Sequence, residues 1–275
     1  MNEKIEKFIQ DFYMKFPTLR PILKSLYGKF LAEYTFSGWG MQTVNELPWN
    51  DKYEENFRND CEDIKEIFQF TPNSTGADKH NMDDFMWRHW IISFSIRYVM
   101  TFTQNSKYNF VECGVGDGMT SFFAGREIKR SDKFNDCKIH LYDSWSSMKS
   151  EDLLESEKTN IGRYHNLNLE RTKKNLLEFN ENITYHPGYI PESFSSGPSS
   201  PDEIIYLHID LNSTKPTIDT LNFFYSKIVK GGIIIFDDYG NRGYPETKKQ
   251  IDDFFFNKPG ILMKSPTGQA IYFCK

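Results

Sequence analysis

Three aspartates stand where two apolar runs of the sequence end. Residues 204–209 run into Asp210, and residues 233–236 run into Asp237 and Asp238. If both runs are neighbouring parallel strands, the three carboxylates lie together at the carboxyl edge of a sheet, where open α/β sheets bind their ligands. Three carboxylates repel one another unless a cation lies between them, and oxygen ligands favour a hard ion, Mg²⁺ before Mn²⁺ or Ca²⁺. The alternative is that one aspartate caps a helix and another faces solvent.

A glycine-rich segment follows an earlier apolar run. Residues 110–118 read Phe-Val-Glu-Cys-Gly-Val-Gly-Asp-Gly and lead into a helical pattern that starts near Thr120. Glycines allow the backbone to turn sharply and to approach a ligand closely, while the free N–H groups of the following helix bind polar or anionic atoms. We therefore expect Gly114, Gly116 and Gly118, together with Thr120, to contact a nucleotide-type ligand.

Two acidic residues accompany this loop. Asp143, followed by Ser144, ends the next apolar run, where a carboxylate can hold two ribose hydroxyls. A dinucleotide fingerprint needs glycine where Met119 stands and an acid near position 134, so the loop does not match a nicotinamide-binding pattern. Glu112 lies at the tip of the first apolar run. Its carboxylate either bonds nearby backbone or lies near the ammonium group of a cofactor, and the residues leave both possibilities open.

Three histidines are candidates for proton transfer or ligand contact. His165 lies in a polar insertion and is an accessible base, whose ordinary pKa suits proton removal near neutral pH. His208 precedes Asp210 by two residues and so points to the same face of its strand, where a core histidine is favoured over a catalytic one. His186, beside Gly188, either lines an adenine pocket or has no role.

Short apolar runs alternate with helix-like segments from Tyr108 onward. This alternation is typical of parallel strands joined by crossover helices. The last two runs are joined by a Pro-Thr-Gly turn and must be antiparallel. The predicted fold is α/β: a Rossmann-like, doubly wound, mostly parallel sheet with a C-terminal antiparallel strand pair. Strands are expected at residues 110–113, 139–142, 183–185, 204–209, 233–236, 261–264 and 269–274, and helices at 120–129, 166–179, 217–229 and 246–256.

The first hundred residues follow a different pattern. Residues 35–51 contain glycines, a proline and two tryptophans, which predicts a packed loop or a lid. We expect residues 1–105 to form an N-terminal helical extension that acts as a lid, as a dimer region or as both. Residues 106–275 then form the ligand-binding domain, with a substrate-side insertion at 146–170. Apolar residues at three- and four-residue steps predict the helices of the extension at residues 5–16, 21–34, 54–70 and 83–102.

The composition narrows the class of protein. The chain has 275 residues and a formal net charge of -5, so no global positive field attracts nucleic acid. Its apolar runs are far shorter than the ~20 residues that span a bilayer, and its start lacks a signal-peptide block. Four scattered cysteines without a CxxC pair fit reduced, mostly buried thiols. We expect a cytoplasmic protein that neither binds nucleic acid nor inserts into a membrane.

From about residue 108 to 275 the chain resembles class I S-adenosylmethionine-dependent methyltransferases. More narrowly, it resembles the macrocin O-methyltransferase family, which methylates sugar hydroxyls in antibiotic biosynthesis. Two positions depart from that family's pattern. Residues 116–119 read Gly-Asp-Gly-Met where the family has Trp-Arg-Gly-Gly, and Asn212 stands where the family often has a second aspartate. The similarity rests on Val111-Glu-Cys-Gly-Val115, Asp143-Ser144-Trp145, Gly188-Tyr-Ile-Pro191, Leu207-His-Ile-Asp-Leu211, Gly231-Gly-Ile-Ile-Ile-Phe-Asp-Asp-Tyr-Gly240, Ile251-Asp-Asp-Phe254 and Gln269-Ala-Ile-Tyr-Phe273.

The resemblance implies a set of roles for these residues. S-adenosylmethionine lies over the glycine loop, and Asp210, Asp237 and Asp238 hold Mg²⁺. The ion binds neighbouring hydroxyls of the acceptor and lowers the pKa of the one attacked. Asp210 or His165 takes the proton, and a homodimer is the default assembly. The implied cofactor contacts are Glu112, Gly114, Gly116, Gly118, Thr120, Asp143, Ser144, Gly188, Tyr189 and Asp210.

The acceptor and the activity leave alternatives open. The expected acceptor is a sugar with vicinal hydroxyls, either free, nucleotide-linked or part of a glycan. A catechol-like phenol presents the same chelating pair of oxygens and suits the same ion. A non-catalytic protein that binds an adenosine ligand is a further alternative, against which the three aspartates argue. A nicotinamide oxidoreductase is disfavoured by Met119 and by the closing strand pair.

Overall fold

The computed structural model describes residues 52–71, 85–103, 107–241 and 243–275. The helices predicted at 5–16 and 21–34 and the loop predicted at 35–51 lie outside the described residues. The chain divides into two compact units, and the second contains residues 66–69 and everything from 87 onward. The sequence boundary at 105 therefore differs from the division by compactness, which groups residues 87–102 with the sheet. A lid or dimer role for the first hundred residues stays a prediction.

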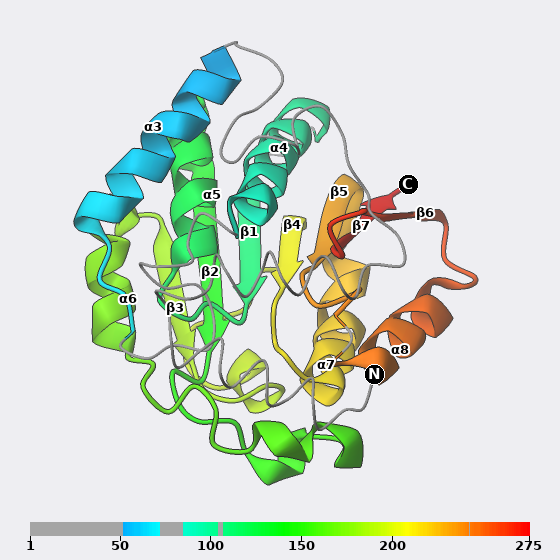
Figure 1. Cartoon of the computed structure of the whole chain (residues 1–275). Coiled ribbons are helices and arrows are strands. Elements are labelled where there is room, and N and C mark those ends of the chain that lie inside the picture. Colours follow the sequence, from blue (N-terminus) through cyan, green and yellow to red (C-terminus); the bar gives the residue numbers. More distant parts are fainter. Residues whose placement is uncertain (1–51, 72–84, 104–106, 242) are drawn as a thin grey trace, which may run out of the picture. The chain divides into compact units, whose positions relative to one another are not determined.

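A seven-stranded sheet organises the second unit (Figure 1). The strand order is β3-β2-β1-β4-β5-β7-β6; the first five strands are parallel, and β7 runs antiparallel to both β5 and β6. This confirms the doubly wound prediction and its closing antiparallel pair. The strands are β1 (Tyr108–Cys113), β2 (Cys137–Asp143), β3 (Ile183–Pro187), β4 (Ile204–Ile209), β5 (Ile228–Phe236), β6 (Gly260–Lys264) and β7 (Ala270–Cys274).

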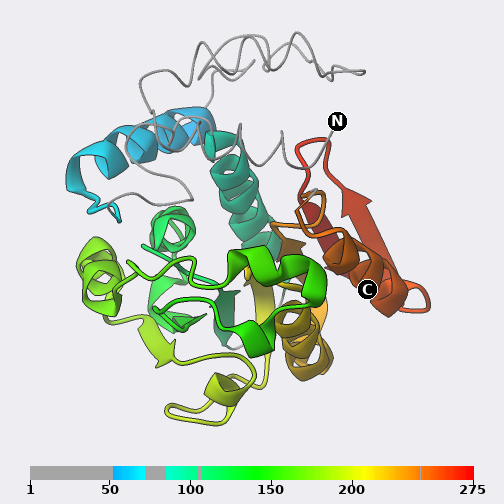
Figure 2. The same ribbon diagram turned by 60° about the horizontal axis from the view of Figure 1, so that its bottom comes forward.

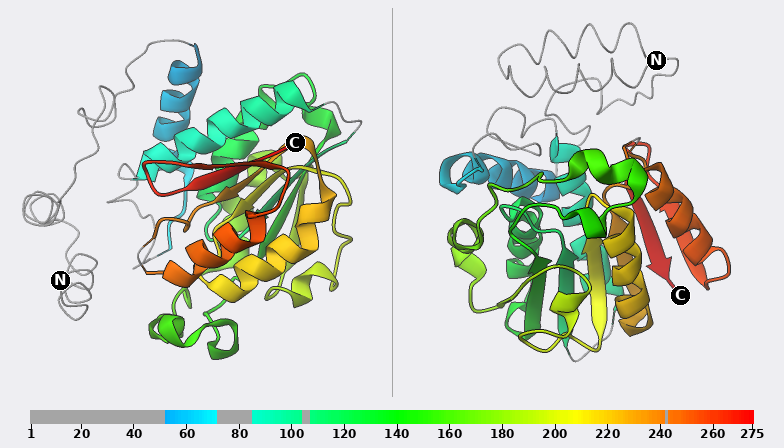
Figure 3. Two further views of the ribbon diagram at one scale, coloured as in Figure 1. Left: turned by 90° about the vertical axis from the view of Figure 1, so that its right-hand side faces the viewer. Right: turned by 90° about the horizontal axis from the view of Figure 1, so that it is seen from below.

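Helices cover both faces of the sheet. Helix α4 lies on one face, and α7 and α8 lie on the other (Figure 3). Helix α5 packs beside α4. The His89 ring of α4 stacks on Phe123 of α5, with the ring centroids 4.7 Å apart. The helices of this unit are α4 (Met86–Phe102), α5 (Met119–Lys129), α6 (Leu169–Asn175), α7 (Thr214–Phe224) and α8 (Pro245–Phe255), and α3 (Lys52–Ile67) precedes them.

Several helices differ from their predicted bounds: those predicted at 54–70 and 83–102 span Lys52–Ile67 and Met86–Phe102, and those predicted at 166–179 and 217–229 differ most. The helix predicted at 217–229 ends at Phe224, and β5 begins at Ile228, because the β-branched pair Ile228-Val229 favours the strand. The helix predicted at 166–179 begins only at Leu169. Its start is fixed by Asn168, whose side chain accepts hydrogen bonds from the first backbone N–H groups of the helix.

The strand order reverses direction between β1 and β4. Strand β1 connects onward to β2 on one side, while its other neighbour is β4. The carboxyl ends of β1 and β4 therefore diverge into different loops, which is where ligands bind in this class of sheet. The insertion after β2 lies beyond these strand ends and crosses in front of the sheet in Figure 2. In the described part of the chain, no helix is long and apolar enough to cross a membrane, and the four cysteines are free thiols.

Candidate active site

The glycine loop presses against the end of β4. Gly114 has a φ of 89°, in the region that disfavours side chains, and a Cβ placed there would lie 1.9 Å from the carbonyl oxygen of Asp210. Only glycine fits this position. The backbone N–H of Asp210 also donates to the carbonyl oxygen of Cys113 at 2.9 Å. The loop expected to hold the methyl donor and the first of the three aspartates are therefore directly adjacent.

The Asp143 carboxylate fixes the shape of this loop. Its Oδ2 accepts the backbone N–H groups of Val115 (2.7 Å) and Gly116 (2.9 Å), and its Oδ1 accepts that of Trp145 at 2.6 Å. Burial raises the pKa of Asp143 above its ordinary value, and these three N–H donors oppose the rise. The side chain predicted to bind ribose hydroxyls thus also organises the loop around them.

The other predicted cofactor contacts gather at the neighbouring strand ends. The N–H of Gly188 donates to the carbonyl oxygen of Asp143 at 2.9 Å, which ties the end of β3 to the end of β2. The hydroxyl of Tyr189 donates to the carbonyl oxygen of Ser147 in the insertion at 2.8 Å. Ser144 stands partly exposed next to Asp143, while Thr120 is buried in the first turn of α5.

Glu112 is buried among side chains. The hydroxyl of Ser121 donates to its Oε2, and its Oε1 lies 3.5 Å from Nδ1 of His208. The sequence analysis considered a backbone partner for Glu112, whereas the structure shows a side-chain partner, Ser121 of α5. His208 is itself buried, with Nε2 3.8 Å from Asp237 Oδ1. Burial lowers its pKa, but Asp237 and Glu112 outweigh burial and raise the pKa of His208 to about 9.

The three predicted aspartates converge. One oxygen from each of Asp210, Asp237 and Asp238 lies within 4.8 Å of the others. The parallel pairing of β4 with β5 sets this geometry, since the N–H of Asp237 donates to the carbonyl oxygen of Ile209 at 3.0 Å. Three carboxylate oxygens in one small volume fit the donor set that Mg²⁺ takes in proteins.

An arginine that the sequence analysis did not single out reaches this cluster. Nη2 of Arg88, on α4, bonds Oδ2 of Asp210 and lies 3.0 Å from Oδ2 of Asp237. The side chains of Arg88, Asp210 and Asp237 are 16%, 19% and 9% exposed, so water screens these contacts only weakly. Arg88 and the aspartate it bonds are 122 residues apart, and no local pattern marks such a pair.

Burial and mutual repulsion give the three carboxylates different affinities for protons. Burial, with the nearby Asp237, raises the pKa of Asp210 to about 6. Burial and both neighbouring aspartates raise the pKa of Asp238 well above its ordinary value. For Asp237, burial acts in the same direction, but Arg88 and His208 outweigh it and lower the pKa below the ordinary value. Asp237 is therefore the carboxylate most firmly held as an anion.

Asn212 bridges two of the aspartates. Its backbone N–H donates to Oδ2 of Asp238 at 2.9 Å, and its Nδ2 donates to Oδ1 of Asp210 at 3.1 Å. The buried Tyr244 hydroxyl donates to Oδ1 of Asn212 at 3.1 Å and accepts from Nη1 of Arg163 at 3.3 Å. Arg163 belongs to the insertion, so this chain of hydrogen bonds joins the insertion to the aspartates. The departure at 212 was visible in the sequence, but its bridging role was not.

The other two histidines lie apart from the aspartates. His165 is exposed, and its Nδ1 lies 3.2 Å from the carbonyl oxygen of Gly162. Within the described residues, no hydrogen bond or ion pair joins His165 to the aspartates, and its role as a base stays a prediction. His186 is buried, stacks on Tyr142 with centroids 4.0 Å apart, and places Nε2 3.0 Å from Nδ1 of His140.

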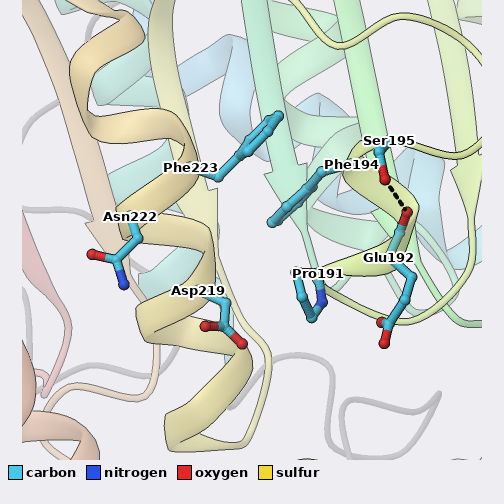
Figure 4. A pocket seen from close by; sticks show the side chains of 7 residues that line it. All are labelled: Pro191, Glu192, Phe194, Ser195, Asp219, Asn222 and Phe223. Atoms are coloured by element: carbon cyan, nitrogen blue, oxygen red, sulfur yellow. Dashed lines mark hydrogen bonds between the residues drawn. The ribbon is translucent and has the colours of Figure 1, made fainter.

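A separate surface hollow of about 560 Å³ lies between α7 and the turn after β3. Figure 4 shows Phe194 and Phe223 side by side, with Asp219 and Glu192 below them in this view. The two rings stack with centroids 4.5 Å apart. None of the residues predicted for the site lines this hollow, so it carries no part of the chemistry described here.

The comparison with known families identifies the family and the class of reaction, and leaves the acceptor open. The model of the macrocin O-methyltransferase (TylF) family matches residues 95–261. The chain belongs to this family. It is an O-methyltransferase of the S-adenosylmethionine type. No curated protein matches the chain.

Two solved structures of methyltransferases share the fold. The O-methyltransferase NovP superposes with a TM-score of 0.58 at 20% sequence identity, over 69% of this chain and 80% of NovP. CalS11, a calicheamicin methyltransferase, superposes with a TM-score of 0.54 at 15% identity, over 87% of this chain and 99% of CalS11. At these identities the likeness establishes the fold alone, and the family membership rests on the family model.

Proposed function

We propose that this macrocin O-methyltransferase family member is a Mg²⁺-dependent enzyme that methylates a sugar hydroxyl flanked by a second hydroxyl. The observation that carries the proposal is the convergence of Asp210, Asp237 and Asp238 directly beside the glycine loop. A methyl donor on that loop and a chelated diol at the aspartates would be neighbours. A homodimeric assembly and a cytoplasmic location stay predictions from the sequence.

The donor half is built to orient a nucleoside and a charged tail. We assign Asp143 and Ser144 to the ribose, the loop from Gly114 to Gly118 to the remainder of the donor, and Gly188 with Tyr189 to the base. The free N–H groups at the start of α5 face the same loop. When bound, S-adenosylmethionine supplies a methyl group on a sulfonium, which is a good leaving group. The residues here serve to align that methyl group with the attacking oxygen.

The acceptor half handles the proton. When bound, Mg²⁺ supplies Lewis-acid stabilisation of the oxyanion that develops on the acceptor. Asp210 is our proposed base, because its backbone adjoins Gly114 of the donor loop and its carboxylate belongs to the cluster at this strand end. The acceptor O–H bond would break toward the Asp210 carboxylate while the O–CH₃ bond forms and the S–CH₃ bond of the donor breaks, which would leave the neutral thioether S-adenosylhomocysteine and a protonated Asp210. Asp237, whose pKa is lowered, would hold the ion as an anion, Asp238 would give up its raised proton affinity on binding the ion, and His165 is the alternative base.

The first test is calorimetry of metal-stripped protein with S-adenosylmethionine and S-adenosylhomocysteine, repeated with Mg²⁺. We expect micromolar binding of both cofactor forms, after which sugar diols and catechols are compared as acceptors with the metal present. If a catechol is methylated faster than any sugar diol, the proposed acceptor is a phenol and not a sugar. Failure to bind either cofactor form would overturn the enzyme function and favour a scaffold.

A matched pair of variants tests the metal role. Asp238→Asn keeps an oxygen for the Asn212 N–H but removes one ligand charge, and it should reduce methyl transfer at least ~100-fold. Asp219→Asn makes the same change in the hollow of Figure 4 and should leave transfer unchanged. Both variants should keep cofactor affinity and fold. Full activity of Asp238→Asn, or of Asp237→Ala, would contradict the proposal that a metal ion held by these aspartates is needed for methyl transfer.

A further inference from the structure

Arg88 holds the oxygens that a metal ion would need. Oδ1 of Asp210 accepts from Asn212 at 3.1 Å, and Oδ1 of Asp237 accepts from Gln269 Nε2 at 2.6 Å. The Oδ2 atoms of both aspartates face Arg88 instead. A hard divalent ion that uses all three aspartates therefore meets a guanidinium at two of its three carboxylates.

The positive charge of Arg88 offsets part of the repulsion among the three carboxylates. Three carboxylates within 4.8 Å destabilise one another in a site from which water is largely excluded. Arg88 neutralises part of this charge through Asp210 and Asp237, and the pKa of Arg88 rises in consequence although burial opposes the rise. The three carboxylates carry more negative charge than one guanidinium offsets, which leaves excess negative charge for a divalent ion.

We infer that Arg88 is a positioning residue that competes with the metal for Asp210 and Asp237, and so sets the metal affinity of the site. The inference rests on the proposed metal-dependent function. Without metal, Arg88 keeps the carboxylates paired at the strand ends. An ion bound through Oδ2 of either aspartate would displace Arg88 from that oxygen, and the positive charge of Arg88 near the ion weakens metal binding wherever the ion lies in the cluster.

The test measures metal binding directly, without turnover. Mn²⁺ binding to metal-stripped protein is followed by electron paramagnetic resonance for the wild type, Arg88→Met, Arg88→Lys and Arg97→Met. Arg97 lies on the same helix but pairs with Glu127 at 2.7 Å, so Arg97→Met removes the same charge away from the aspartates. S-adenosylhomocysteine affinity is measured on each preparation as the check on the donor half.

We expect Arg88→Met to bind Mn²⁺ roughly tenfold or more tightly than the wild type, because a close positive charge and a competing donor are both removed. Arg88→Lys keeps the charge but offers a point donor in place of a planar fork, so its affinity should fall between the two. Arg97→Met should match the wild type. If Arg88→Met unfolds when stripped, Arg88→Lys carries the comparison.

Other outcomes overturn the inference in distinguishable ways. Equal or weaker Mn²⁺ binding by Arg88→Met, with S-adenosylhomocysteine affinity kept, would mean that Arg88 does not compete, and would leave the proposed function standing. If Arg97→Met binds Mn²⁺ more tightly by the same factor, the effect comes from the net charge of the protein and not from the position of Arg88. Absence of Mn²⁺ binding in every variant would remove the metal from the proposed function and the competition with it.

Discussion

The two halves of the site balance their charges by different means. On the donor half, the Asp143 carboxylate is held by three backbone N–H groups of its own and the adjoining loop. On the acceptor half, Asp210 and Asp237 depend on side chains from distant elements, with Arg88 on α4 and Gln269 at the start of β7. Only a substitution to proline removes a backbone N–H donor, whereas many substitutions remove a side-chain donor and a competing cation can displace a charged one.

This difference suggests a division between a fixed half and an adjustable half. A loop shaped by its own N–H groups presents the same surface whether or not a ligand is bound. A cluster balanced by an arginine can exchange that arginine for another cation. We therefore expect damage to the donor half to appear as lost stability and lost cofactor affinity. Damage to the acceptor half should appear in metal affinity and rate.

The largest effect is expected from Gly114→Ala. The φ of 89° costs an alanine about 1 kcal/mol, and its Cβ would lie 1.9 Å from a backbone carbonyl oxygen that cannot move away alone. We expect several kcal/mol of lost stability, measured by urea unfolding, and loss of S-adenosylhomocysteine binding. Gly162→Ala is the control: Gly162 has a φ of 79° but no atom within 4 Å of the added Cβ, so only the smaller strain remains. Equal losses in the two variants would mean that strain, not the close approach, requires Gly114.

Acid should act next, through a histidine pair under the donor half. Burial, helped by His186, lowers the pKa of His140 to about 4, and burial lowers that of His186 to about 4. Between pH 6.5 and 4 these two histidines therefore bind more protons in the unfolded chain than in the folded one. The stability that the pair contributes is present in full above pH 6.5 and should be lost as the pH drops through this window, by roughly 3 kcal/mol for each histidine. The buried aspartates with raised pKa act in the opposite sense, so the contribution of the pair is read as the difference between the wild type and His140→Gln.

The measurement is urea unfolding at a series of pH values. His140→Gln should flatten the pH dependence, because one of the two shifted groups is gone. His165→Gln, at an exposed histidine, should leave the dependence as in the wild type. An unchanged slope in His140→Gln would show that the pair does not titrate as described.

Features set by local sequence could be predicted, whereas contacts between distant elements could not. The strand ends and the glycine loop were predictable, because alternation and punctuation by glycine are local signals. Asp210, Asp237 and Asp238 followed from the rule that parallel strands end at one edge. Arg88 was not predictable, since its segment reads simply as a buried helix and its contact depends on how α4 crosses the sheet.

Partners of predicted residues were missed for the same reason. Glu112 was expected at the tip of its strand, but its contacts with Ser121 and His208 come from two other elements. Asn212 was noted as a departure from the family, yet its φ of 53° and its two bonds to aspartates follow from the loop geometry. Periodicity indicates which face a residue occupies, and packing decides which side chain it meets.

A smaller loss is expected from Asp143→Asn. A carboxamide offers one oxygen, so at least one of the three N–H donors of the loop would face an N–H₂ group. The expected cost is about 1–2 kcal/mol of stability and a fall in S-adenosylhomocysteine affinity, read by urea unfolding and calorimetry. Mn²⁺ affinity should not change. Asp136→Asn, exposed at the other end of β2, is the control, and a drop in Mn²⁺ affinity with Asp143→Asn would argue against separate halves.

The smallest effect is expected where the insertion meets the acceptor half. Tyr244→Phe removes the hydroxyl that joins Arg163 to Asn212 while leaving the ring in its buried place. Asn212 then loses the hydrogen bond that helps to hold it where it bonds Asp210 and Asp238. One such hydrogen bond contributes about 1 kcal/mol. We expect kcat/KM for the acceptor to fall at most about tenfold, with S-adenosylhomocysteine affinity unchanged.

The control for Tyr244→Phe is Tyr225→Phe. The Tyr225 hydroxyl lies 3.5 Å from that of Tyr272, away from the aspartates, so its loss should leave kcat/KM as in the wild type. A fall in cofactor affinity with Tyr244→Phe would mean that the insertion acts on the donor half instead. A fall confined to kcat would place its influence on the aspartates, which is the result that a chain of hydrogen bonds from Arg163 through Tyr244 to Asn212 requires.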